Sequence, residues 1–277
     1  MKNILVIILF ILALPTFAFA HQPRIVETGD VKVIDPEISK AYYGVLSGES
    51  HTYTIESEEA FELYVGILEP DIESAKKDFV AEIYKGDAMI EKLGGPEAEW
   101  KSFFEPFGQS TYWDGGEYRA EVEAGTYKVV VSSPDNEGKY SLAIGGLEFF
   151  DQKEGLNALR IIPELKRDFF EESPISFIKS PFGWGYILIL YILAFIVGFL
   201  YRFLLKKFAK GTARGAGKNI GKYDRIIRLV IWIGLLVWAI TTSWSPWLIF
   251  FSGFALFEAI FSWCGFYAAL GKNTCPS

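Results

Sequence analysis

Histidine and cysteine, two residue types that often carry catalysis and metal binding, are scarce in this chain of 277 residues. It has two histidines, His21 and His51, and two cysteines, Cys264 and Cys275. Two thiols are too few for a tetrahedral zinc site unless subunits pair, and a Ser-His-Asp hydrolase would have to use one of the two histidines. The chain also contains no HExxH sequence, nucleophile elbow or Walker loop. No catalytic activity is evident.

Residues 21–180 contain no cysteine, and they carry 32 acidic against 16 basic side chains. A domain of about 130 residues buries enough surface to fold without disulfide bonds. Residues 181–277 are basic instead, with ten Lys and Arg against two acids. Because these basic residues flank apolar stretches, they indicate membrane topology, and we expect no nucleic-acid partner.

The first twenty residues have the pattern of a secretory signal peptide. Lys2 precedes an apolar run, Pro15 breaks it, and Ala18-Phe19-Ala20 fits the small-residue cleavage pattern. We predict a signal peptide over residues 1–20 and a mature chain that begins at His21. An uncleaved anchor is the alternative, and the next segment is exported in either case.

Three apolar stretches in the C-terminal part predict transmembrane helices over residues 183–205, 226–242 and 247–270. About 20 apolar residues span the hydrocarbon core of a bilayer, so the lipid bilayer is a predicted partner. A basic loop over residues 206–225 follows the first span and predicts a cytoplasmic position. We therefore expect an inner (plasma) membrane protein with its N-terminal domain outside the cytoplasm and its C-terminus inside.

The exported part predicts an antiparallel β-sandwich or jelly roll over residues 21–150. Short runs rich in Val, Ile, Tyr and Phe alternate with turn sequences such as Gly94-Gly95-Pro96, a pattern typical of such folds. The predicted strands are Ala41–Leu46, Thr52–Ile55, Phe61–Leu68, Phe79–Tyr84, Tyr118–Val122, Tyr127–Ser132 and Tyr140–Ile144.

Two further segments of the exported part leave alternatives open. The aromatic segment from Trp100 to Trp113 predicts a loop that caps the core or, alternatively, a carbohydrate platform. Residues 151–182 predict a connector with a helix near Gly155–Phe170, which alternatively lies on the outer membrane face.

Two motifs at the ends of the last apolar pair carry a family resemblance. One runs from Asn219 through Gly221-Lys222-Tyr223-Asp224-Arg225 to Arg228, and the other is Cys264-Gly265-Phe266-Tyr267 followed by Gly271-Lys272-Asn273-Thr274-Cys275. Residues 219–276 resemble the YgaP-type inner-membrane domain, a two-helix hairpin found alone or beside rhodanese domains. The family usually has Cys-Pro-Leu-Tyr where this chain has Cys264-Gly265-Phe266-Tyr267. No rhodanese domain is present here, so the resemblance does not imply sulfur transfer.

Glu258 is the one acid inside a predicted span, and ionisable residues there are functional candidates. A pairing with Arg228 of the neighbouring helix would neutralise both charges; a proton or ion path is the alternative. Cys264 and Cys275 lie at the predicted cytoplasmic end, where a redox or sulfur-handling role and a purely apolar role for Cys264 both remain open.

The two histidines allow one metal hypothesis. Cleavage after Ala20 would give His21 a free α-amine beside its imidazole, and His51 would add a third nitrogen, which is the ligand set of a copper histidine brace. The alternative is that both histidines are ordinary surface residues that bind no metal.

Two functional classes follow. The first is a non-enzymatic, membrane-anchored extracytoplasmic binding or scaffold protein of the cell envelope, whose partner is an envelope protein or a glycan. The second is a metal-binding or redox-active membrane protein that uses His21 and His51 outside, or Cys264 and Cys275 inside.

Overall fold

The structure is a computed structural model that describes residues 21–208 and 217–275. The chain divides into two compact units, one made of the strands up to Phe107 together with Thr111–Gly155, and the other of Gly108–Ser110 with the helices after Leu156. The predicted signal peptide lies outside the described residues, as does part of the predicted basic loop.

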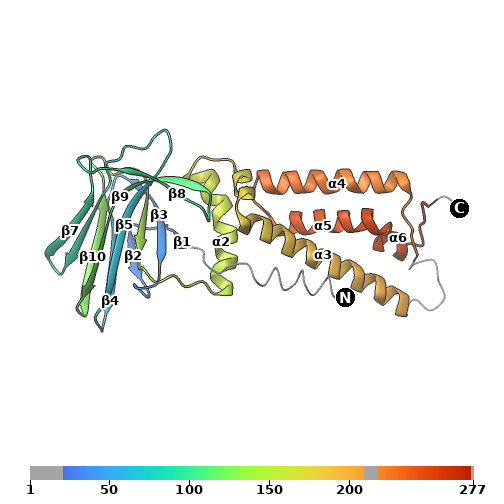
Figure 1. Ribbon diagram of the computed structural model, residues 1–277, viewed down its shortest axis with the longest axis horizontal. Helices are drawn as coiled ribbons and strands as arrows, with labels where there is room; N and C mark the ends of the chain where they lie inside the picture. The colour runs from blue at the N-terminus through green and yellow to red at the C-terminus, as the bar shows by residue number, and fades with distance from the viewer. Residues whose placement is uncertain (1–20, 209–216, 276–277) are drawn as a thin grey trace. The chain divides into compact units, whose positions relative to one another are not determined.

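The first unit contains two β-sheets (Figure 1). One has six strands in the order β1-β3-β11-β5-β9-β8, and the other has five in the order β2-β4-β10-β6-β7. The strands are β1 (Gln22–Ile25), β2 (Asp30–Val33), β3 (Lys40–Ser47), β4 (His51–Ser57), β5 (Phe61–Pro70), β6 (Val80–Lys85), β7 (Ala88–Gly94), β8 (Lys101–Glu105), β9 (Ser110–Val122), β10 (Gly125–Ser132) and β11 (Glu137–Ile144).

The two sheets share one hydrophobic core, as in a β-sandwich. In β10, Tyr127, Val129 and Val131 are buried, whereas the residues between them are less so, because successive side chains of a strand point to opposite faces. Side chains from the central strands of both sheets complete the core, among them Leu63 of β5 and Ile83 of β6. The alternation seen in the sequence therefore determines which face of each sheet is covered.

Two strand pairs depart from the predicted antiparallel arrangement. β1 pairs with β3 and β2 pairs with β4 in parallel. The pairs of β11 with β3 and β5, of β10 with β4 and β6, of β5 with β9 and of β6 with β7 are antiparallel. The chain passes alternately between the two sheets from β1 to β4, so each of these strands meets its neighbour after an excursion through the opposite sheet. Parallel neighbours need such a connection, because a tight turn joins only antiparallel strands.

All seven predicted strands are present, and four strands were not predicted: β1, β2, β7 and β8. The prediction of an aromatic loop between Trp100 and Trp113 was wrong, since the segment forms β8 and the beginning of β9. Phe103 and Phe104 of β8 are half exposed, while Tyr112 of β9 is buried. Aromatic residues favour strands as well as loops, and the ladder with β5 decides the outcome here.

The second unit is helical. Its elements are α2 (Gln152–Glu164), which begins in the first unit, the π-helical turn η1 (Leu165–Phe169), the 3₁₀ segment η2 (Pro174–Lys179), α3 (Pro181–Phe208), α4 (Lys222–Thr241), α5 (Pro246–Phe261) and the short α6 (Gly265–Ala269). By length and composition one described helix, Pro181–Lys207, is long and apolar enough to cross a membrane. The apolar helix α5 is shorter, at 16 residues.

The predicted third span over residues 247–270 is not one continuous helix. α5 ends at Phe261, and Ser262 has a left-handed backbone with φ of 53°. The buried side chain of Asn219 bonds both backbone groups of Cys264, with Oδ1 accepting from its N–H at 2.8 Å and Nδ2 donating to its carbonyl at 2.9 Å. These bonds satisfy the backbone at the break, which the apolar composition of the stretch did not reveal.

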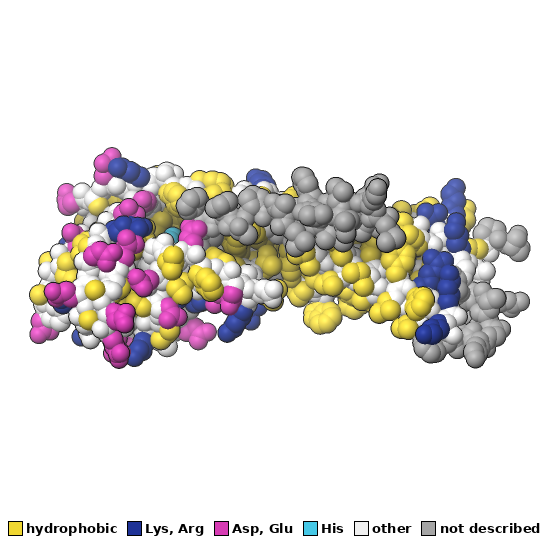
Figure 2. Space-filling model, turned by 60° about the horizontal axis from the view of Figure 1, so that its bottom comes forward, with side chains coloured by type: hydrophobic (Ala, Val, Ile, Leu, Met, Phe, Trp, Pro, Cys, Tyr) yellow, Lys and Arg dark blue, Asp and Glu magenta, His cyan; other side chains and the backbone are white. Residues whose placement is uncertain are grey.

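Helix α5 lies against both α3 and α4 (Figure 1). Phe257 of α5 packs edge-on against Phe195 and Phe199 of α3, and the Tyr191 hydroxyl of α3 bonds the Ser252 hydroxyl of α5 at 3.0 Å. The face of α3–α5 seen in Figure 2 is largely apolar, and basic side chains gather at the end where α3 ends and α4 begins. That surface suits lipid, because a helix exposed to lipid needs no polar outer face.

Candidate functional site

A groove lined by charged and apolar residues lies at the open edge of the sandwich, beside the edge strands β1 and β2. It has a volume of about 680 Å³, and the segment from Phe149 to Glu154 forms part of its wall. Cavities of roughly 300 to 1,000 Å³ suit small ligands. Eight of the seventeen lining residues are charged: Arg24, Glu27, Asp30, Lys32, Asp35, Lys40, Asp151 and Glu154.

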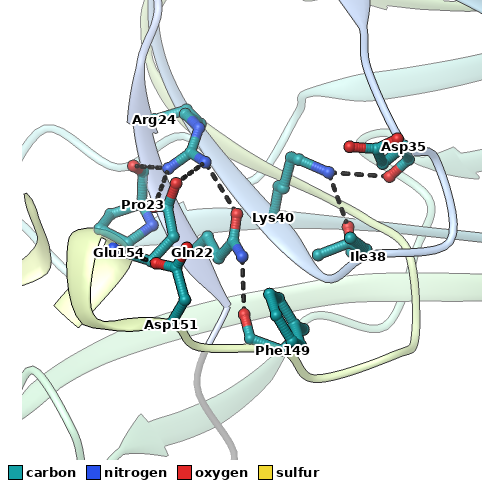
Figure 3. A network of polar contacts seen from close by, with 9 residues as sticks. All are labelled: Gln22, Pro23, Arg24, Asp35, Ile38, Lys40, Phe149, Asp151 and Glu154. Atoms are coloured by element: carbon teal, nitrogen blue, oxygen red, sulfur yellow. Dashed lines mark hydrogen bonds and ion pairs between the residues drawn. The ribbon is translucent and has the colours of Figure 1, made fainter.

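Arg24 of β1 organises one wall of the groove (Figure 3). Its guanidinium forms a bidentate pair with Glu154 of α2 at 2.8 and 2.9 Å and also donates to the Gln22 side chain at 2.7 Å. Gln22 in turn donates to the Phe149 carbonyl at 2.6 Å, and Asp151 accepts the Glu154 backbone N–H at 2.7 Å. Bidentate arginine–carboxylate pairs are among the stronger and more directional polar contacts, so this wall is preorganised.

Lys40, the first residue of β3, is buried at the base of the same network, with 7% of its surface exposed. Its ammonium group donates to the backbone carbonyls of Asp35 at 2.8 Å and Ile38 at 3.2 Å (Figure 3). Burial lowers the pKa of Lys40, while the charges of Asp35 and Glu154 oppose that shift. The sequence prediction missed this groove, because nothing in the separation of residues 24, 40 and 154 along the chain shows that they meet.

The two predicted copper ligands belong to different sheets. His21 directly precedes β1 of the six-stranded sheet, and His51 is the first residue of β4 in the five-stranded sheet. The Nδ1 atom of His21, just before β1, hydrogen-bonds the Ser39 hydroxyl, and Nδ1 of His51 in β4 lies 2.7 Å from the Tyr140 hydroxyl. Burial lowers the pKa of both imidazoles, with Asp30 opposing the shift at His51. In the described residues no three His, Cys, Asp or Glu side chains cluster as metal ligands. A brace would also use the α-amine of a cleaved chain, so the copper hypothesis stays a prediction.

Three of the predicted residues of the helical unit meet in space. Arg228 of α4 lies 3.2 Å from the Glu258 carboxylate of α5, and one of its terminal nitrogens lies 3.8 Å from the Cys264 sulfur. The ring of Tyr267 lies near the same guanidinium, at 5.6 Å. Glu258 and Cys264 are buried, so this is a desolvated ion pair with a thiol beside it. Cys275 is partly exposed and separate from this cluster, and both cysteines are free.

The two motifs that carry the family resemblance also bind each other. Besides the Asn219–Cys264 bonds, the Gly221 N–H donates to the Thr274 hydroxyl at 3.0 Å, and that hydroxyl hydrogen-bonds Asp224. The Thr274 N–H donates to the Asn219 carbonyl at 3.1 Å. The motifs therefore hold the start of α4 against the segment that follows α5.

The comparisons with known proteins support the family resemblance predicted for this part of the chain. Residues 216–277 match the family described as "Inner membrane protein YgaP-like, transmembrane domain". The C-terminal part therefore carries a YgaP-like membrane domain, as predicted, and associates with the lipid bilayer. No curated protein matches the chain.

Two of the solved structures that resemble part of this chain have low sequence identity to it. The pre-peptidase C-terminal domain of a collagenase from Bacillus anthracis is 11% identical and covers 46% of this chain and 95% of its own, with a TM-score of 0.26. CorA, a surface-associated copper-binding protein important in copper acquisition in Methylomicrobium album BG8, is 7% identical over 44% of this chain and 98% of its own, with a TM-score of 0.24. At such scores neither likeness informs the function of this chain.

Proposed function

We propose that this chain is a membrane-anchored binding protein that displays its β-sandwich outside the cytoplasm, with the groove beside β1 and β2 as the binding surface. The observation that carries the proposal is the preorganised groove wall of Arg24, Glu154 and Gln22 in a domain tied to a YgaP-like membrane domain. Charged side chains fixed by each other are ready to bind a polar ligand without further ordering cost.

The proposed arrangement follows the predicted boundaries. A signal peptide over residues 1–20 exports the sandwich of residues 21–150, the connector of residues 151–182 leads to the bilayer, and α3, α4 and α5 are the three membrane helices. Both ends of the bundle support this order. Trp244, between α4 and α5, donates to the Pro174 carbonyl just before α3 at 2.9 Å, whereas Tyr201 near the end of α3 stacks edge-on with Trp263 after α5. The helices therefore run back and forth between two ends.

The charges of the two ends support the orientation. Exposed lysines gather where α3 ends and α4 begins, and this end belongs to the cytoplasm by the positive-inside rule. They are Lys206, Lys207, Lys218 and Lys222. The opposite end, beside Trp244, then lies on the extracytoplasmic side of the bilayer.

The orientation can be tested with single-cysteine variants, because the chain has only two cysteines. One variant, Cys264→Ala, keeps the partly exposed Cys275. The other removes both cysteines and carries Ser50→Cys in the exposed turn between β3 and β4. In intact spheroplasts a membrane-impermeant maleimide should label the Ser50→Cys chain and should label Cys275 only after lysis. Labelling of Cys275 but not of the Ser50→Cys chain would overturn the proposed orientation.

A further inference from the structure

Lys40 differs from the other cations of the groove in the partners that it has. Arg24 is paired with Glu154, and Lys32 is paired with Glu56 at 2.6 Å. The Lys40 ammonium instead donates to two neutral carbonyls, of Asp35 and Ile38, and within the described part of the chain it forms no ion pair. Two of its three N–H donors are thus used, and its charge has no carboxylate in contact.

A buried charge without a partner is unfavourable, because it loses its hydration without gaining an ion pair. Lys40 is more than nine-tenths buried, and it is one of the residues that line the groove. A carboxylate placed there would accept the remaining N–H and supply the missing countercharge in one contact. The first element of the ligand is therefore an anionic oxygen.

The rim of the groove has the opposite charge. Glu27, Asp30 and Asp35 line it with exposed carboxylates, and none of the three has an ion-pair partner among the described residues. Asp151 adds a fourth carboxylate, which caps the first turn of α2. A simple anion would be repelled by this rim, whereas a ligand with a cationic group next to its carboxylate would be attracted by both parts.

We propose that the groove binds a zwitterionic ligand, an amino acid or a short peptide, with its α-carboxylate on Lys40 and its ammonium group on the acidic rim. The groove volume of about 680 Å³ accommodates a ligand of a few residues. Phe149, half exposed at the same groove, provides an apolar surface for a side chain. This inference rests on the proposed function and names its ligand class.

The probe is the dipeptide Ala-Ala, titrated calorimetrically into the purified full chain in nanodiscs. Two analogues test the two charges on unaltered protein: Ala-Ala amide lacks the carboxylate, and N-acetyl-Ala-Ala lacks the ammonium group. We expect Ala-Ala to bind and each analogue to bind at least tenfold more weakly. Failure of Ala-Ala to bind at millimolar concentration, or an amide that binds as well as the acid, would overturn the proposal.

The residue assignment is tested with Lys40→Met, which keeps the apolar stem and removes the charge. It should weaken Ala-Ala binding at least tenfold, whereas Lys85→Met, in the same sandwich but outside the groove and ion-paired to Glu123, should change it less than threefold. The unfolding temperatures of both variants show whether the sandwich remains folded. Equal effects of the two substitutions would contradict the role of Lys40. Because this binding is measured on purified protein, it fails or succeeds independently of the maleimide test of orientation.

Discussion

The sandwich and the helical unit place their apolar side chains in opposite ways. Leu63 and Val65 in the centre of β5 have no exposed surface. Along α3, in contrast, Leu193 and Ile196 are exposed by 46% and 54%, and the most apolar window of that helix is only 17% buried. Both regions are rich in apolar residues, but only the sandwich hides them within the protein.

The difference matches the surroundings expected for each region, which are water for the sandwich and lipid for the helical unit. In water, burial of apolar surface drives folding, so the alternating strands of the sandwich cover one face of each sheet. In lipid there is no such drive between helices, and packing and polar contacts hold them together. The Tyr191–Ser252 hydrogen bond and the Arg228–Glu258 pair are contacts of that kind.

The largest expected effect is a difference in stability between two leucine-to-alanine substitutions, one in the sandwich and one in the helical unit. Leu63→Ala removes a fully buried side chain and should lower the free energy of unfolding of the sandwich by about 4 kcal/mol. Leu193→Ala, on the exposed side of α3, should change the stability of the helical unit by less than about 1 kcal/mol. Hydrogen exchange read by mass spectrometry reports on strands and helices separately. A Leu193→Ala effect as large as that of Leu63→Ala would mean that this face of α3 is packed against protein rather than lipid.

The next effect concerns the ion pair of the helical unit. Glu258→Leu leaves the Arg228 guanidinium half buried without its carboxylate and should destabilise the unit by about 3 kcal/mol. The double variant Arg228→Met, Glu258→Leu removes both charges and should recover most of that loss. Thermal unfolding of the full chain in micelles measures both. A double variant that is no more stable than the single one would show that the pair has a role beyond mutual neutralisation.

The smallest effect is a dependence of the sandwich on pH. Burial lowers the pKa of His51 below its ordinary value of 6.5, so between the two values the unfolded chain binds more protons than the folded one. The contribution of His51 to the free energy of unfolding is therefore fully present above a pH of about 6.5. It is lost as the pH falls through the pKa that His51 has in the folded chain. His51→Gln should reduce the difference between the unfolding temperatures at pH 8 and pH 5. An unchanged difference would show that His51 titrates alike in both states.

Much of the fold was predictable from local patterns. The seven predicted strands correspond to β3, β4, β5, β6, β9, β10 and β11, because these runs are rich in Val, Ile, Tyr and Phe and often alternate apolar with polar residues. β1 and β2 were missed, since Gln22-Pro23-Arg24-Ile25 and Asp30-Val31-Lys32-Val33 are short and carry charges typical of a loop. Their parallel partners hold them in the sheets, and partners are not visible in a local window.

The ion pair of the helical unit and the groove of the sandwich also differ in how far the sequence predicted them. Glu258 and Arg228 stood out because charges are rare in apolar stretches, and their neighbourhood followed from two helices packed side by side. Nothing comparable marked Arg24, Lys40 or Glu154 among the 48 charged residues of the acidic part. A charge on a soluble domain is ordinary, and only its surroundings show whether it is buried, paired or open to a ligand.

The amino-acid sequence by itself determined the apolar C-terminal helices, the YgaP-like motifs and the β-rich character of the acidic part, because each depends on composition or on spacing over a few residues. The tertiary structure alone decided that the third apolar stretch breaks at Ser262, where Asn219 satisfies the backbone from 45 residues away. It also decided that Lys40 is buried beside a groove and that, among the described residues, its ammonium group contacts backbone carbonyls and no carboxylate. Burial and pairing depend on neighbours distant in the chain, which only folding brings into contact.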